Sequence, residues 1–215
     1  MGTVNLAHTS LENPNLEKFI FAGTSEEYGN QDNFPTPETA PLRPNQPYAI
    51  SKVASDNYLR YLELAYDFPV CVVRPFNTYG RTDNFQFVTE RIITQMLKNP
   101  KEITLGNPKP VRDLLYVDDH VDGYMKVVES KVFPPCVNLC TGIGTSIGEL
   151  AEMIKELLDW KGEIIWNTTF QRPTEIWNLV GDNSLARETL GWSPEYSLEE
   201  GLSLTIEKIR SKLNK

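Results

Sequence analysis

The sequence predicts an α/β fold in which a parallel sheet is joined to a small second lobe. Two mainly apolar runs, "KFIFAG" (18–23) and "PVCVVRPFN" (69–77), are typical of strands buried on both faces. A helical pattern lies between them, and a strand, a helix and a strand of this length form a crossover between parallel strands. A chain of 215 residues is long enough for one sizeable core with a small lobe.

The helix between these strands is predicted over about 48–66. It follows a polar, proline-rich loop at 30–47, in which Asn45 and Pro47 provide a helix start. Its apolar residues recur at helical spacing, and they are Ile50, Val53, Ala54, Tyr58, Tyr61, Leu62 and Ala65.

Helical and strand patterns also alternate in the rest of the chain. The segment 112–130 is expected to begin as a strand or turn and to continue as a helix. These later segments can form a lobe over the carboxyl ends of the parallel strands, where such sheets bind ligands. The remaining elements expected are helices at about 85–98, 146–159 and 197–212, and strands at 102–105, 136–140 and 163–166.

Composition and charge exclude several classes of protein. The net charge of −8 leaves nothing to neutralise phosphates along a duplex, so we expect no nucleic-acid partner. An anionic ligand must instead be held by a few placed arginines. The sequence shows no signal peptide and no apolar run near about 18 residues, so we expect no membrane partner and a cytoplasmic protein.

The cysteines and histidines are interpreted as structural. Cys136 and Cys140 lie in the apolar segment "CVNLC", and with Cys71 they make an odd number of thiols, so we expect packing as small apolar side chains. Since His8 and His120 are the two histidines of the chain, no triad or metal cluster can be built from them. We therefore expect no metal site.

The segment "PYAISK" (47–52) contains a candidate catalytic pair. Tyr48 and Lys52 are four residues apart on a helix and share one face. A lysine ammonium near a phenol favours the phenolate, so we expect Lys52 to lower the pKa of Tyr48 and make it a usable base. The spacing alone is weak evidence, because about half a match arises by chance in a chain of this composition.

A second polar cluster, "AGTSEEYG" (22–29), follows the first strand. If the chain stays extended there, Thr24, Glu26 and Tyr28 face one side and Ser25 and Glu27 the other. A hydroxyl and a carboxylate at the carboxyl end of a buried strand can serve as hydrogen-bond donor and proton abstractor. A helix cap or turn explains the same residues about equally well.

Together these motifs resemble the extended short-chain dehydrogenase/reductase family that acts on nucleotide sugars, over the whole chain. The segments that carry this resemblance are "GTVNL" (2–6), "GTSEEYG" (23–29), "YAISK" (48–52), "RPFNTYG" (74–80), "LGNPKPVRDLLYVDD" (105–119) and "RPTEIWNLVGDNSLARETLGWSP" (172–194). Within the family, Thr-Ser-Glu with "FVT" (87–89), "LGN" and "RPTE" is most similar to GDP-mannose 4,6-dehydratases. UDP-glucuronate decarboxylases share the Thr-Ser-Glu.

The resemblance implies a Rossmann-like parallel sheet that lacks its first strands. Residues 1–80 would be the carboxyl-terminal part of the catalytic domain. Residues 81–215 would be mainly a substrate-binding lobe, from which about 112–140 returns to the sheet.

The resemblance also implies catalytic roles. Tyr48 takes the proton of the sugar C4 hydroxyl while hydride leaves C4 for NAD or NADP, Lys52 holds the cofactor ribose, and Thr24 binds the C4 oxygen. Glu26 then removes the C5 proton as the C6 hydroxyl departs. Pro75 is assigned to the cofactor.

For the substrate, a nucleotide-diphosphate sugar, the resemblance assigns Arg112 and Arg172 to the phosphates and Glu175 to a ribose hydroxyl. Asn77 is assigned to the sugar or its phosphate, and Arg91 is a weaker candidate for substrate binding. Ser25 is also assigned to the substrate, at a position where some dehydratases carry an aspartate. Glu27 departs from the family, which usually has an apolar residue there.

Three functions remain open at this point. The first is an NAD(P)-dependent 4,6-dehydratase or epimerase, the second is a nucleotide-sugar decarboxylase, and the third is a non-catalytic fragment that binds nucleotide sugar or a partner protein. We expect either a homo-oligomer or a complementing amino-terminal segment.

The cofactor's pyrophosphate has no evident site in this sequence. The family holds it on a glycine-rich turn between the first strand and its helix, and no such turn precedes Tyr48. Gly142 and Gly144 follow a strand and precede a helix, but the resemblance places them in the substrate lobe. We therefore expect a truncated form that alone binds NAD(P) weakly or not at all and has no turnover.

Overall fold

The computed structural model describes residues 1–81, 84–131, 134–167, 169 and 174–213. Its central sheet contains β1 (Phe19–Ala22), β2 (Val70–Pro75) and β6 (Cys136–Leu139), which are parallel and lie in the order β1-β2-β6. The predicted α/β class with a parallel sheet is confirmed. Among the described residues β1 pairs with β2 alone, so β1 is an edge strand.

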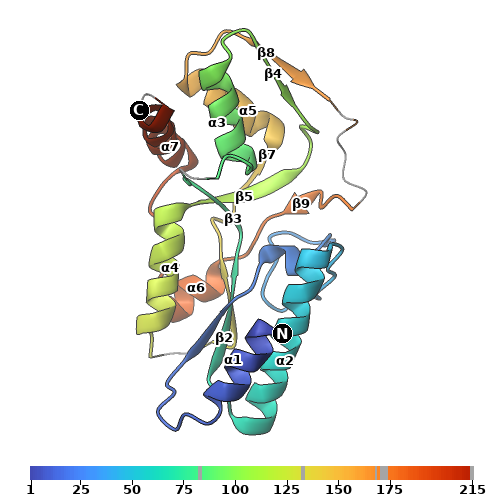
Figure 1. Cartoon of the computed structure of the whole chain (residues 1–215), viewed down its shortest axis with the longest axis vertical. Helices are drawn as coiled ribbons and strands as arrows, with labels where there is room; N and C mark the ends of the chain where they lie inside the picture. Colours follow the sequence, from blue (N-terminus) through green and yellow to red (C-terminus); the bar gives the residue numbers. More distant parts are fainter. Residues whose placement is uncertain (82–83, 132–133, 168, 170–173, 214–215) are drawn as a thin grey trace.

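Helices cover both faces of this sheet, as Figure 1 shows. The helices α1 (Gly2–Ser10) and α2 (Pro47–Tyr66) pack on one face, and α4 (Val117–Glu129) and α6 (Ser184–Leu190) on the other. Alternate residues of β2 supply the two cores: Val70 and Val72 face Leu59 and Leu62 of α2, while Cys71 and Val73 face α4 and α6. Burial on both faces explains the continuous apolar run of this strand.

A second group of strands lies beyond the carboxyl ends of the central sheet. After Phe76 the chain of β2 continues as β3 (Asn77–Tyr79), which pairs in parallel with β5 (Val111–Tyr116). Two short strands flank β5, namely β7 (Gly144–Ser146), which is antiparallel to it, and β9 (Asn178–Leu179), which is parallel.

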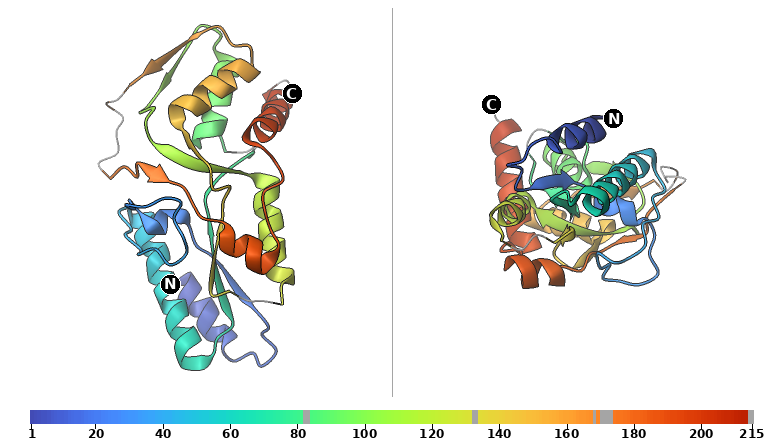
Figure 2. Two further views of the ribbon diagram at one scale, coloured as in Figure 1. Left: turned by 180° about the vertical axis from the view of Figure 1, so that it is seen from behind. Right: turned by 90° about the horizontal axis from the view of Figure 1, so that it is seen from below.

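The second lobe caps this end of the molecule (Figures 1 and 2). It contains the helices α3 (Val88–Lys98), α5 (Ile147–Leu157) and α7 (Leu198–Leu213) and the parallel strands β4 (Glu102–Leu105) and β8 (Glu163–Trp166). Buried side chains from all three helices form its core, including Ile92, Ile93, Leu150, Ile154 and Leu202.

The predicted extension after β1 is wrong. Residues Ser25–Tyr28 form a short 3₁₀ helix, η1, because Thr24 caps it: the Thr24 hydroxyl accepts a hydrogen bond from the Glu26 N–H, and the Glu27 carboxylate accepts one from the Thr24 N–H. The pattern Thr-x-x-Glu was therefore a cap rather than an alternating strand.

The three cysteines are buried and unpaired, which agrees with the structural role expected for them. None of the helices in the described part of the chain is long and apolar enough to cross a membrane.

Candidate active site

Helix α2 carries Tyr48 and Lys52 to the carboxyl end of β1. The helix begins at Pro47, whose fixed φ suits the first helical position, so Tyr48 lies in its first turn. The Lys52 ammonium donates to the carbonyl of Ala22, the last residue of β1, at 2.7 Å, and lies 5.8 Å from the centre of the Tyr48 ring. The helix and the strand end are thereby joined at this point.

Thr24 completes a polar group around the phenol. Its side chain lies near enough to Tyr48 to lower the pKa of the phenol, and Tyr48 is 53% exposed. Partial burial raises the Tyr48 pKa, the Thr24 side chain opposes this rise, and the nearby carboxylates of Glu26 and Glu27 add to it.

The expected lowering of the Tyr48 pKa by Lys52 is therefore wrong for this structure. The Lys52 ammonium points to a backbone carbonyl, while burial and the two carboxylates outweigh the opposing effect of Thr24. The Tyr48 pKa therefore lies above its ordinary value in this structure.

The two adjacent glutamates have different surroundings. Glu26 lines a cleft of about 330 Å³. Glu27 is fully buried and pairs with Arg74 on β2, its Oε2 atom lying 2.9 Å from Nε. Glu26 therefore lies on the cleft and Glu27 does not, although the two side chains are separated by the 3₁₀ turn and not by strand alternation; the role of Glu26 as a base stays a prediction. Ser25 is buried and is not part of the described lining.

The cleft brings together residues that are far apart in the sequence. It is walled by both lobes, and its polar lining includes most of the residues expected to bind substrate. These are Asn77 at the start of β3, Arg91 on α3, Arg112 on β5 and Glu175. Arg172, the other arginine assigned to phosphate, lies outside the described residues, and its role stays a prediction.

Arg112 and Glu175 interact directly. The Arg112 guanidinium lies 2.9 Å from Glu175 Oε1 and also donates to the carbonyls of Val111 and Ile176. Both side chains are about 15% exposed, so the pair is largely shielded from water. The two side chains, which were assigned separately to phosphate and ribose, thus form one ion pair in which Glu175 orients the guanidinium.

Arg91, unlike Arg112, is not paired with a described residue. It is exposed at the cleft, and its guanidinium has no hydrogen bond or ion pair with any described residue. The adjacent Asn77 Oδ1 is buried and likewise lacks a described partner. A cation and an amide oxygen without partners in one cleft are suited to binding an anionic, hydroxyl-rich ligand.

Sequence reasoning missed several residues of the cleft. Gln46, Phe87 and Asn107 are part of its lining. Phe87 and Asn107 belong to the quoted segments "FVT" and "LGN", which were the available signal. Gln46 precedes Tyr48 by two residues and carried no signal of its own.

Pro75 ends β2 and lies opposite Leu139 of β6, and its assignment to the cofactor stays a prediction. The histidines have structural surroundings. His120 bonds to the Thr78 hydroxyl, and burial followed by the charge of Arg81 lowers its pKa to about 4, while His8 lies 3.4 Å from the Tyr58 hydroxyl. Across the described ranges no group of three or more His, Cys, Asp or Glu side chains is arranged to hold a metal.

The glycine segment at 142–144 does not offer a phosphate cradle. Asp113 accepts the N–H groups of Thr141 and Gly142. The first N–H groups of α5 donate to Pro110 O, Pro108 O and the capping hydroxyl of Ser146. Because these donors are already used, the dinucleotide interpretation of this segment fails.

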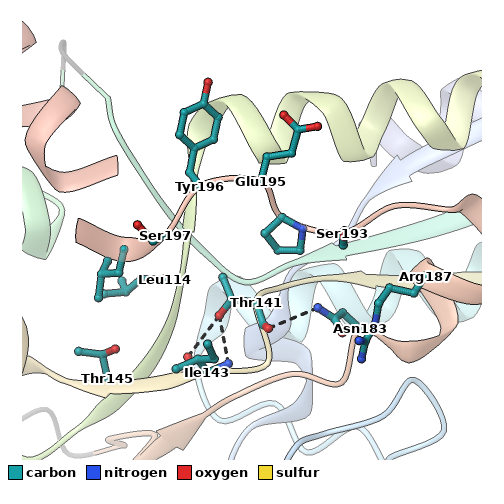
Figure 3. Close-up of a pocket in the computed structure, with 12 residues that line it drawn as sticks. Leu114, Thr141, Ile143, Thr145, Asn183, Arg187, Ser193, Glu195, Tyr196 and Ser197 are labelled. Atoms are coloured by element: carbon teal, nitrogen blue, oxygen red, sulfur yellow. Dashed lines mark hydrogen bonds between the residues drawn. The ribbon is translucent and has the colours of Figure 1, made fainter. Parts of the chain in front are cut away.

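A second hollow, of about 400 Å³, lies between α6, the loop after β6 and the segment before α7 (Figure 3). Thr141, Asn183, Arg187 and Tyr196 line it, and it shares no lining residue with the cleft. It contains none of the residues predicted for the site.

Known proteins resemble this chain throughout. A family model described as GDP-mannose 4,6 dehydratase matches residues 1–205. A putative GDP-L-fucose synthase 2 from Arabidopsis thaliana is 31% identical over 94% of this chain and 65% of its own length. A dTDP-D-glucose 4,6-dehydratase from Mus musculus is 30% identical over 99% of this chain and 61% of its own length.

Among solved structures, a UDP-glucose 4-epimerase from Thermotoga maritima with UDP-glucose superimposes with a TM-score of 0.90 at 32% identity. This match covers 99% of the chain and 69% of the epimerase. The chain thus spans about two thirds of the length of these relatives. Given the match over residues 1–205, the chain belongs to the nucleotide-sugar epimerases and dehydratases of the short-chain dehydrogenase/reductase family.

Proposed function

We propose that the cleft binds a nucleotide-diphosphate sugar and that Glu26, with the neighbouring Thr24 and Tyr48, carries out 4,6-dehydration of the sugar. The observation that carries this proposal is the position of Glu26 on the cleft beside the Thr24–Tyr48 pair. Inversion at C4 needs only a base at the C4 hydroxyl, whereas elimination of the C6 hydroxyl needs a second base at C5. A carboxylate in this place favours a GDP-mannose 4,6-dehydratase-like activity over a 4-epimerase.

The residues present fit one half of a nicotinamide cofactor. An ammonium has three N–H donors, and the described bond of Lys52 to Ala22 uses one of them, so two remain for ribose hydroxyls. Pro75 would border the same ribose and ring. For the pyrophosphate, the segment at 142–144 offers no free set of backbone N–H groups, because those donors are already used. When bound, the nicotinamide supplies the chemistry of accepting a hydride from the sugar and giving it back.

The side chains move the protons. Tyr48 takes the proton of the C4 hydroxyl, with Thr24 holding the C4 oxygen, as the C4–H bond breaks. The resulting ketone acidifies the C5–H bond, and Glu26 removes that proton. The same proton leaves with the C6 hydroxyl as water, and hydride enters at C6. A proton then returns to C5, and the proton that Tyr48 took from the C4 hydroxyl accounts for it. The net change is the loss of one water.

The phosphates would lie on Arg91 and on the Arg112–Glu175 pair, together with Arg172. Which nucleotide base is bound, and whether NAD or NADP is used, are separate questions that a ligand screen answers. Because the thiols are free, a reducing compartment suits the chain, and we propose that it acts in the cytoplasm.

We also propose that two copies associate through the exposed face of α2. Besides Tyr48, four large apolar or aromatic side chains on this helix are more than half exposed, which is unusual for a monomer surface. They are Ile50, Tyr61, Leu64 and Tyr66.

Two measurements test the function. Calorimetry on the 215-residue chain with GDP-mannose, UDP-glucose and free mannose is expected to show binding of a nucleotide sugar and none of mannose. Micromolar NAD+ is expected not to bind. Products formed with added millimolar NAD+ are then followed by mass spectrometry, and any loss of one water that occurs should be absent in Tyr48→Phe and Glu26→Gln.

The alternatives give different results. Loss of carbon dioxide from a UDP-hexuronate identifies a decarboxylase, and an unchanged mass with altered sugar stereochemistry identifies an epimerase. Nucleotide-sugar binding without any conversion favours a non-catalytic binding chain. Absence of nucleotide-sugar binding contradicts the proposal altogether.

A further inference from the structure

Glu27 occupies a buried position beside the Thr24–Tyr48 pair, and both of its carboxylate oxygens are used. Oε1 accepts the backbone N–H of Thr24 at 3.0 Å, and Oε2 accepts from Arg74 Nε at 2.9 Å. The carboxylate therefore joins the turn after β1 to the neighbouring strand β2. Its backbone carbonyl also accepts the N–H of Arg43, in the loop that leads into α2.

The surroundings of Glu27 form a balanced ionic cluster. Arg74 is buried and donates on its other side to Asp56 of α2 and to the hydroxyl of Tyr28. Asp56 in turn lies 3.4 Å from Arg60 Nε. The carboxyl groups of Glu27 and Asp56 thus face the guanidinium groups of Arg74 and Arg60, and this opposes the cost of burying the ionised carboxylates.

The absence of a side chain at Gly23 leaves space for the Glu27 carboxylate. A side-chain carbon at position 23 would lie 2.8 Å from Glu27 Oε1 and 3.1 Å from Val72. Thr24 follows directly, is only 8% exposed, and would otherwise bury its N–H without a partner. The Thr24 side chain lowers the Tyr48 pKa, so a shift of the Thr24 backbone would change the surroundings of the phenol.

We propose that Glu27 is a positioning residue for the candidate active site. Its carboxylate fixes the Thr24 backbone against Arg74, and this fixes the Thr24 hydroxyl at the Tyr48 phenol and Glu26 at the cleft. The inference rests on the proposed function only for its effect on turnover, since the contact itself is measurable in the free chain.

The experiment measures how strongly the Thr24 hydroxyl acts on Tyr48. The chain is labelled with ¹³Cζ-tyrosine, and the Tyr48 pKa is titrated by NMR with and without Thr24→Val. In the wild-type background, removal of the hydroxyl raises the Tyr48 pKa, because the hydroxyl stabilises the phenolate. The same substitution is then made in Glu27→Gln and Glu27→Val backgrounds.

In Glu27→Gln the amide has one acceptor oxygen and one NH₂ donor, so it cannot replace Oε1 at Thr24 and Oε2 at Arg74 together, and we expect no more than about half of the wild-type shift to remain. Glu27→Val removes both acceptors, leaves Arg74 with Asp56 and Tyr28, and should abolish the shift. Comparing shifts rather than absolute pKa values cancels the effect of the lost charge.

Asp56→Asn is the matched control. It weakens the same buried cluster from the other side of Arg74 but leaves the Glu27–Thr24 bond in place, so the full Thr24→Val shift should persist. Faster amide exchange at Thr24 in the two Glu27 variants and not in Asp56→Asn gives a second readout. Equal shifts in all four backgrounds overturn the proposal, and so does a loss in Asp56→Asn as large as in Glu27→Gln. Nucleotide-sugar binding is measured separately, so its failure would point to the proposed function instead.

Discussion

Replacement of Arg91 by alanine separates ligand binding from stability. The Arg91 guanidinium is exposed, lines the cleft and has no partner among the described residues, so its removal breaks no hydrogen bond or ion pair of that part of the chain. We expect the free energy of unfolding to stay within about 0.5 kcal/mol of wild type. Arg112→Ala would not separate binding from stability, because it leaves the largely buried carboxylate of Glu175 without its ion-pair partner.

The loss in affinity follows from the bond that Arg91 would make. A hydrogen bond between charged groups contributes about 1.5–3 kcal/mol, and an exposed arginine belongs at the lower end of that range. About 1.4 kcal/mol corresponds to a tenfold higher Kd. Calorimetry with the best-bound nucleotide sugar measures this, and the effect should shrink as salt is raised.

Arg187→Ala is the control for Arg91→Ala. Arg187 is another exposed arginine on a helix, but it lines the separate hollow of Figure 3. Its replacement should leave the Kd within about twofold of wild type. An unchanged Kd in Arg91→Ala, or an equal loss in both variants, would refute the assignment of Arg91 to the ligand phosphates.

Two further predictions concern Glu27 and α2. Burial raises the pKa of Glu27 to about 7 against the opposing charge of Arg74, so the folded chain holds a proton that the unfolded chain releases above about pH 4.5. Stability should therefore fall between pH 4.5 and 7, by on the order of 2 kcal/mol more in wild type than in Glu27→Gln, as denaturant unfolding will show. A steeper fall in the variant would contradict this sign. On α2, Leu64→Glu places a charge on a side chain that is 86% exposed and should lower the sedimentation mass of an oligomer, whereas Met125→Glu on α4 should not. Equal masses for Leu64→Glu and wild type would exclude this face as the contact.

The elements with strong periodicity were predictable from the sequence. Helix α2 and strand β2 follow directly from their apolar patterns, since one face or both faces are buried. The short strands β7 and β9 were not predicted, because they consist of three and two residues and exist only through pairing with β5. No local pattern specifies such strands.

Some features of the candidate site were likewise predictable from the sequence and others were not. Tyr48 and Lys52 were found from their spacing on one helix. The pairing of Arg112 with Glu175 joins positions 63 residues apart and depends on how β5 meets the segment before β9. The different roles of Glu26 and Glu27 required the cap at Thr24, whose Thr-x-x-Glu signature was readable in the sequence but competed with a strand pattern.

A crystal structure of the 215-residue chain with its best-bound nucleotide sugar tests the central claim most directly. Our account predicts the diphosphate on Arg91 and Arg112, the sugar C4 hydroxyl within hydrogen-bonding distance of Thr24 and Tyr48, and C5 facing the Glu26 carboxylate. A nucleotide sugar bound with its sugar ring away from Tyr48, or in the hollow beside Arg187, would contradict it.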